Sequence, residues 1–87
     1  MKLKPDFVLR QIAENWVVIP VGEQMLNKPG ILTTNQSGAF LWKLLEQDVT
    51  PEQLLKAMLS EYDVSPEIAR QDINEFLEKL RDAGCIE

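Results

Sequence analysis

Side chains that could perform chemistry are few in this sequence. Two pairs of carboxylates lie close together along the chain, Glu61 with Asp63 and Glu75 with Glu78. Paired carboxylates can act as acid and base when a hydrophobic pocket shifts the pKa of one of them. Neither pair has a neighbour of a type that would orient it. We therefore interpret both pairs as solvated helix surface.

The chain contains no histidine and a single cysteine, Cys85. A zinc site takes three or four His or Cys ligands, and a catalytic triad takes an imidazole. An intramolecular disulfide needs a second cysteine. Cys85 has no neighbour that would activate its thiol, so we expect it to pack at the end of the last helix. The sequence predicts no enzyme activity, no metal site and no cofactor.

Glycine is also sparse, with four residues at positions 22, 30, 38 and 84. Their spacing matches neither the phosphate-binding loop of nucleotide hydrolases nor the dinucleotide-binding fingerprint. Gly38 lies near a predicted helix start, where we expect it to allow close packing.

The formal net charge is −5 and is unevenly spread. Residues 1–34 carry four basic and three acidic side chains, a net of +1, whereas residues 35–87 carry five basic and eleven acidic ones, a net of −6. Such a surface repels phosphate backbones and anionic lipids. We therefore expect no nucleic-acid partner and no membrane partner, and a preference for neutral or cationic ligands.

The first third of the chain predicts three strands. Residues 7–13 and 16–21 are rich in branched and aromatic side chains, and a third short run follows at 31–34. Glu14-Asn15 predicts a tight hairpin turn, because Asn tolerates positive φ. Pro20 cannot donate to a ladder, so it predicts the end of a strand or a bulge. A loop with a turn at 27–30 precedes the third strand, which we expect at the edge of an antiparallel sheet.

The remainder of the chain predicts three helices. The first runs from about Asn35 to Leu45, capped by Asn35 or Ser37. The second begins with a capping box at 50–53, with proline at the first helical position. The third begins with Ser65 and Pro66, and Gly84 predicts its end.

These elements predict an α+β fold in a single domain over residues 1–87, with the sheet in 1–34 and the helices in 35–87. A three-stranded antiparallel sheet beside a three-helix bundle is winged-helix-like. No apolar run reaches the roughly 18 residues of a membrane helix and no signal-peptide core is present, so we expect a cytoplasmic protein. The side chains expected to be mostly buried are Trp16, Leu41, Trp42, Leu55, Leu59, Phe76 and Leu77.

Winged-helix folds often bind DNA, with the last helix as the recognition element. Here residues 65–83 carry three basic and five acidic side chains, a net of −2, whereas DNA-binding helices concentrate Lys and Arg. The third strand remains as a candidate surface. Its sequence, Ile31-Leu32-Thr33-Thr34, has no charge to protect a sheet edge, which favours an edge left open for an incoming peptide strand over one covered by a loop or the N-terminus.

Several segments of the chain match a known family pattern nearly end to end. The most specific are Asn35 followed by Gly-Ala-Phe-Leu-Trp at 38–42, and Glu-Tyr-Asp-Val at 61–64. The other matching segments are residues 3–10, 18–22, 44–45 and 50–54, Phe76, Leu77 and Leu80, and the closing Ala83-Gly84. In these features the chain resembles the pyrroloquinoline quinone (PQQ) synthesis protein D (PqqD) family, also described as the RiPP precursor peptide recognition element. At the junction after the third strand, Thr34 stands where family members commonly have leucine.

The resemblance implies a peptide-binding module without catalysis. Such domains bind the leader of a ribosomally made precursor peptide, which adds as a strand beside the third strand and packs against the third helix. The domain then presents the peptide to a modifying enzyme, often a radical S-adenosylmethionine protein. Carried onto this sequence, the binding strand edge is Ile31, Leu32, Thr33 and Thr34. The helix groove and its rim are Arg70, Ile73, Asn74, Phe76, Leu77, Lys79 and Leu80.

Two other functions remain open on the sequence alone. One is a winged-helix DNA-binding regulator, and the other is a protein–protein adaptor unrelated to peptide maturation. The chain could be a monomer, or a homodimer that pairs through the same uncapped edge strand.

Overall fold

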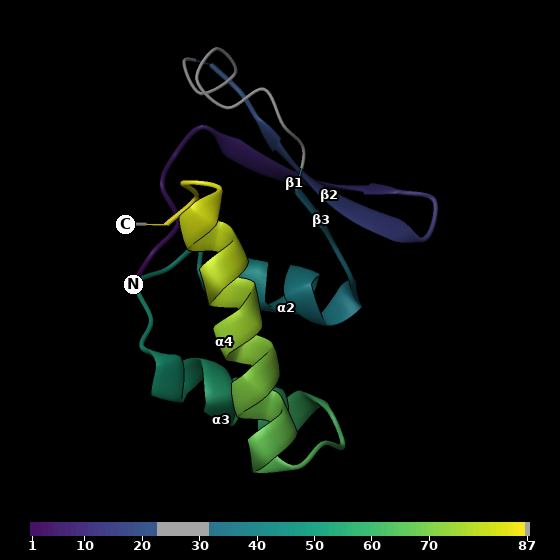
Figure 1. Ribbon diagram of the computed structural model, residues 1–87, viewed down its shortest axis with the longest axis vertical. Coiled ribbons are helices and arrows are strands. Elements are labelled where there is room, and N and C mark those ends of the chain that lie inside the picture. Colours follow the sequence, from purple (N-terminus) through teal and green to yellow (C-terminus); the bar gives the residue numbers. More distant parts are fainter. Residues whose placement is uncertain (23–31, 87) are drawn as a thin grey trace.

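The computed structural model describes residues 1–22 and 32–86 and has the predicted α+β architecture. Its elements are β1 (Phe7–Ile12), β2 (Asn15–Pro20), β3 (Leu32–Thr34), α2 (Gln36–Leu44), α3 (Pro51–Glu61) and α4 (Pro66–Asp82). The sheet lies on one side of the helices, and the long helix α4 crosses α3 (Figure 1). The turn predicted at 27–30 and the start of the third strand at Ile31 lie outside the described residues. No helix in the described part of the chain is both long and apolar enough to cross a membrane.

The sheet is antiparallel, with the strand order β1-β2-β3. In the central strand β2, Val17, Val18 and Pro20 are buried and Trp16 and Ile19 are half-buried, which agrees with its apolar side chains on both faces. It ends at Pro20, as the missing amide hydrogen predicts. The third strand lies at an edge, as predicted, with Thr34 opposite Trp16 and Leu32 opposite Val18.

The turn between β1 and β2 lies one residue earlier than the sequence predicted. Ile12 is opposite Asn15, so the turn residues are Ala13 and Glu14, and Ala13 takes a positive φ of 56°. The prediction from Glu14-Asn15 was therefore wrong. The register of the hairpin puts Leu9 opposite Val18 on the face that meets the helices. A shift of one residue would turn that apolar row to the other face, so burial outweighs the local preference of asparagine for the turn.

The core lies between the sheet and the three helices. Of the seven side chains predicted to be buried, Leu41, Trp42, Leu55, Phe76 and Leu77 are buried, and Trp16 is half-buried. The prediction for Leu59 was wrong, because this side chain is 37% exposed. The core-facing stripe of α3 is made by Leu54, Leu55 and Met58. The next residue is rotated by about 100° from Met58 around the helix axis, which carries it out of the core.

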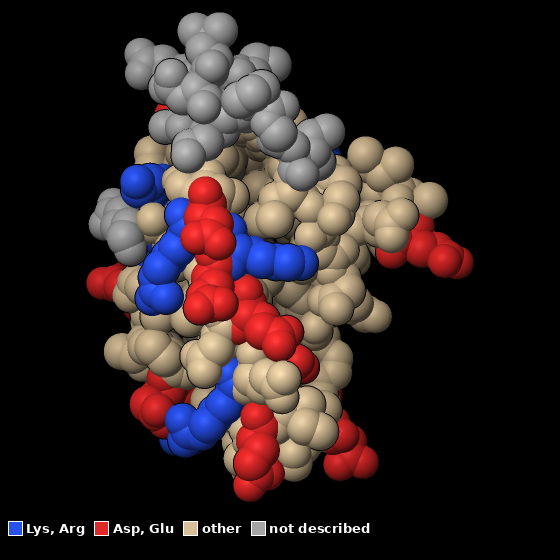
Figure 2. Space-filling view, viewed as in Figure 1, with Lys and Arg blue, Asp and Glu red and all other residues tan. Residues whose placement is uncertain are grey.

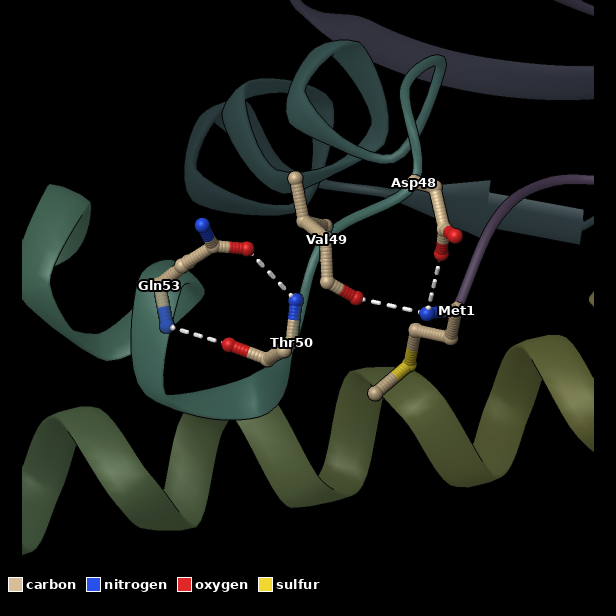
Figure 3. A network of polar contacts seen from close by, with 5 residues as sticks. All are labelled: Met1, Asp48, Val49, Thr50 and Gln53. Carbon is tan, nitrogen blue, oxygen red and sulfur yellow. Dashed lines mark hydrogen bonds and ion pairs between the residues drawn. The ribbon is translucent and has the colours of Figure 1, made fainter.

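The helix ends carry the predicted caps. Asn35 caps α2, Ser65 caps α4, and Thr50 and Gln53 form both hydrogen bonds of a capping box at α3 (Figure 3). At the end of α4, Gly84 takes a positive φ of 74°, and the amides of Gly84 and Cys85 donate to the carbonyls of Arg81 and Leu80. That pair of bonds is the Schellman motif, which glycine favours because it lacks a Cβ.

The N-terminal segment connects the loop between α2 and α3 with the end of the chain. The Met1 amine donates to Asp48 Oδ1 at 2.8 Å and to the Val49 carbonyl at 2.6 Å (Figure 3). The hydrogen bond from this amine, together with its charge, lowers the pKa of Asp48. Further along, Leu3 forms an antiparallel bridge with Ile86. The segment therefore fixes the start of the sheet against the α2–α3 loop and against the residues that follow α4.

We expect Thr50→Ala to lower the free energy of unfolding by about 1 kcal/mol, because it leaves the Gln53 amide without its side-chain acceptor. Urea unfolding followed by circular dichroism measures the change. Ser60→Ala is the matched control, since Ser60 is exposed near the other end of α3 and caps nothing. Equal losses in the two variants would contradict a capping role.

Candidate functional site

A groove lies where β3 passes into α2 and faces α4. It has a volume of about 120 Å³ and is called the β3–α4 groove below. One wall comes from the β3–α2 junction and the other from a single face of α4. The lining residues are Thr34, Asn35, Ser37, Gly38, Leu41, Asp72, Glu75, Phe76 and Lys79.

The apolar part of this groove depends on a close approach between α2 and α4. A methyl group placed on Gly38 would collide with Thr34 Oγ1 and would lie 3.1 Å from Phe76 Cε1. Leu41 and Phe76 are both buried, so each presents only a small part of its side chain to the groove. Gly38 thus allows the close packing predicted for it. Thr34, at the position where the family commonly has leucine, has the small side chain that fits against Gly38.

Asparagine and serine at the junction are held by local hydrogen bonds. Asn35 Oδ1 accepts from the Gly38 amide at 2.9 Å and from Ser37 Oγ at 2.9 Å. These bonds cap α2 and fix the angle between β3 and α2. The wall of the groove formed by the β3–α2 junction is therefore held in shape by hydrogen bonds within the chain.

The α4 wall of the groove is mainly acidic. Asp72 and Glu75 line it together with one cation, Lys79. These residues follow a spacing of three and four, so they lie in one row along the helix. Figure 2 shows acidic side chains along much of the face over α4, with basic side chains among them. A ligand in the groove meets two carboxylates and one ammonium group.

The edge of β3 beside the groove has no strand partner among the described residues. The strand pairs with β2 on its other side, through Leu32, Thr33 and Thr34. An edge strand presents backbone N–H and C=O groups that an added strand can use. Thr33 is exposed, whereas Leu32 and Thr34 are half-buried.

The structure divides the residues predicted for the helix side of the site into three groups. Phe76 and Lys79 line the β3–α4 groove together with Thr34, which was predicted from the strand. Ile73, Leu77 and Leu80 lie in the core, at most 3% exposed. Arg70 and Asn74 line a separate hollow of about 60 Å³ beside α3, where Arg70 pairs with Glu52 at 3.4 Å. Ile31 lies outside the described residues.

Sequence reasoning missed the two carboxylates of the groove. Asp72 and Glu75 share the helix face of Lys79, seven and four residues before it, and a helical wheel drawn from Lys79 would have found them. The apolar stripe of α4 was taken as the groove, whereas most of it fills the core. The described residues contain no group of three or more His, Cys, Asp or Glu side chains that could hold a metal ion.

Comparison with known proteins agrees with this fold. The family profile of coenzyme PQQ synthesis protein D (PqqD) matches residues 16–86. A solved structure described as TbiB1 in complex with the TbiA(beta) leader peptide is 25% identical, with a TM-score of 0.78, and the match covers 100% of this chain and 95% of that one. A lasso peptide synthetase B1 complexed with the leader peptide is 21% identical, with a TM-score of 0.73 over 97% and 93% of the two chains, a likeness of fold. A comparison with curated protein sequences finds no match.

The fold is that of a small α+β domain, in which the uncharged strand β3 lies beside a groove lined by α4. The matched profile spans most of the chain, so the chain belongs to the PqqD family. The resemblance noted in the sequence is thereby confirmed.

We expect Gly38→Ala to lower the free energy of unfolding by about 1–3 kcal/mol, because the added methyl group overpacks the contact with Thr34 and Phe76. Urea unfolding checks the value. In a Thr34→Ala background the same substitution should cost less, because the colliding hydroxyl is gone. Equal costs in both backgrounds would show that the contact does not limit the approach of the helix.

Proposed function

We propose that this chain binds the leader segment of a ribosomally made precursor peptide at the β3–α4 groove and presents the peptide to a modifying enzyme. The observation that carries the proposal is an uncharged strand edge beside a groove lined by α4, and this edge has no strand partner within residues 1–22 and 32–86. The similarity to TbiB1, whose structure was solved with a leader peptide, supports it. Family resemblance favours a radical S-adenosylmethionine protein as the modifying enzyme.

In the proposed complex the leader adds as a strand beside Leu32, Thr33 and Thr34. Each backbone hydrogen bond contributes only about 0.5–1.5 kcal/mol, and three residues offer few of them. Side-chain contacts must therefore supply much of the affinity. Phe76 and Leu41 give the groove an apolar floor, and Asp72 and Glu75 give it a site for a cation. The leader should bring an apolar side chain and a basic or neutral neighbour to this groove.

The proposed role involves no catalysis by the chain itself. The sequence has no histidine, and the side chain of its one cysteine, Cys85, is buried at 1% exposure. The acidic face of α4 makes the alternative of DNA binding less favourable, because the phosphate backbone is repelled there. A homodimer formed through β3 would compete with the leader for the same edge.

A proline scan of β3 tests the backbone part of the proposal. Successive residues of a strand point their N–H groups to opposite sides, so only one of Leu32→Pro and Thr33→Pro removes a donor from the outer edge. The variant that removes a donor to β2 should lose stability. The other should stay folded, as circular dichroism can check, and should bind a fluorescently labelled leader at least tenfold more weakly. If Leu32→Pro and Thr33→Pro both stayed folded and both bound the leader as tightly as the unaltered chain, this edge would be excluded as the binding site.

Charge reversal on α4 tests the side-chain part. Glu75→Arg should weaken binding of a leader that carries Lys or Arg by at least tenfold, because it removes a carboxylate from the groove and adds a cation. Glu78→Arg is the matched control, since Glu78 is on the same helix, is exposed and does not line the groove. Affinity for the unaltered chain should fall moderately as salt rises. Equal effects of the two substitutions, or tighter binding at high salt, would count against the groove.

Delivery of the peptide is tested by enzyme turnover. The purified chain alone should leave the precursor unmodified, whereas adding it to the modifying enzyme should raise the rate of modification. Mass spectrometry of the precursor over time measures both. A rate that does not respond to the chain over a range of concentrations would exclude the delivery role.

A further inference from the structure

A second groove lies at the opposite edge of the sheet from the first. It is formed by β1, the N-terminal segment and α2, has a volume of about 390 Å³, and is called the β1–α2 groove below. Its apolar lining includes Phe7 and Leu9 from β1 and Trp42 from α2. Phe7 and Leu9 are half-buried, so part of each side chain remains open to a ligand.

The polar lining of this groove is basic, in contrast to the chain as a whole. Three cations, Lys4, Arg10 and Lys43, face it, against one anion, Glu46. The chain has a net charge of −5, so this concentration of cations runs against its overall balance.

These cations have no carboxylate partner among the described residues, where the ion pairs are Met1 with Asp48 and Arg70 with Glu52. Lys43 Nζ lies 5.3 Å from the centroid of the Trp16 ring, and Arg10 Nη1 donates to the Leu9 carbonyl at 3.2 Å. All three cationic side chains are exposed. Unpaired cations around a partly apolar floor are complementary to an acidic segment with an apolar side chain.

We propose that the β1–α2 groove is the docking site for an acidic segment of the modifying enzyme, an inference that rests on the proposed function. Presentation of a peptide requires that the enzyme and the leader bind the chain at the same time. The strands β1 and β3 are separated by β2, so the two edges lie on the order of 10 Å apart. An enzyme held at β1 leaves the β3 edge open and lies close to the peptide bound there.

The charges of the two grooves favour this division over the reverse one. The lining of the β3–α4 groove carries a net charge of −1, from Asp72, Glu75 and Lys79. The lining of the β1–α2 groove carries a net charge of +2, from three cations and Glu46. A leader with basic residues is attracted to the first groove and repelled by the second. The acidic segment has the opposite preference, so the two ligands do not compete.

The first experiment uses a defined probe with the full chain. The probe is a fluorescein-labelled ten-residue peptide that alternates glutamate and leucine, and its counterpart has lysine in place of each glutamate. Fluorescence anisotropy should show that the glutamate peptide binds and that an excess of the unlabelled lysine peptide does not displace it, because the lysine peptide prefers the acidic β3–α4 groove. Displacement of the glutamate peptide by the lysine peptide, or no binding of the glutamate peptide, would overturn the proposal.

Charge-reversal substitutions test whether the glutamate peptide binds at the β1–α2 groove. Arg10→Glu should weaken binding of the glutamate peptide at least tenfold, and Lys4→Glu serves as a second variant from another wall of the groove. Lys56→Glu, an exposed position on α3 with the same change of charge, should change it less than twofold. If Lys56→Glu matched the groove variants, the effect would be one of net charge and the proposal would fail.

The enzyme itself provides the final test. Arg10→Glu should leave leader affinity unchanged, yet it should reduce both binding of the purified modifying enzyme and the stimulation of its turnover. A loss of leader affinity with enzyme binding intact would place the leader in the β1–α2 groove and overturn the inference. Concentration-dependent self-association that Arg10→Glu abolishes would assign the groove to a second copy of the chain. If the unaltered chain bound no leader but still bound the enzyme through this groove, the proposed function alone would fail.

Discussion

The packing of α4 is the constraint on which the rest of the structure depends. One stripe of this helix, including Ile73, Phe76, Leu77 and Leu80, fills the core between α2, α3 and the sheet. The row beside that stripe, Asp72, Glu75 and Lys79, lines the β3–α4 groove. Phe76 belongs to both, because it is buried and still reaches the groove. Rotation of α4 would therefore change the core and the groove together, so the free energy of core packing holds the groove in shape.

The close approach at Gly38 is the second link between folding and function. The β3–α2 junction lies close against α4 because Gly38 has no Cβ, which would collide with Thr34 Oγ1 and lie 3.1 Å from Phe76 Cε1. Asn35 fixes the direction of the chain through its hydrogen bonds to the Gly38 amide and Ser37. Few residues thus place a strand edge and a helix face next to each other, which is the arrangement that recognition by strand addition requires.

Much of the fold followed from the sequence, because its local signals agree with one another. The capping box at Thr50, the proline-led helix at Ser65 and the stop at Gly84 each have one physical interpretation, and each is present. The turn at Ala13 was placed wrongly because register is decided by burial across the sheet. Leu59 was placed wrongly because it lies beside the stripe of α3 that packs into the core.

The candidate site was harder to predict than the fold, because only one side of α4 lines the groove. Apolar residues at helical spacing identify the stripe that needs burial, and in α4 the core takes nearly all of it. The polar row beside it is defined only once the rotation of the helix relative to β3 is known. For this reason the sequence did not predict Asp72 and Glu75, which line the groove together with the predicted residue Lys79. Arg70 and Asn74 point to α3 instead, on a side of the helix that periodicity alone does not distinguish.

The two edges of the sheet differ in charge, and the two proposed binding sites depend on that difference. On β1, Arg10 places a guanidinium on the Leu9 carbonyl, and a charged side chain at an edge hinders the pairing of a further strand. On β3, residues 32–34 carry no charge, so a backbone can approach. Strand addition is thus favoured at β3, whereas β1 favours contacts made by side chains in the groove beneath it. A sheet of three strands thereby offers two non-equivalent surfaces, and its central strand keeps them apart.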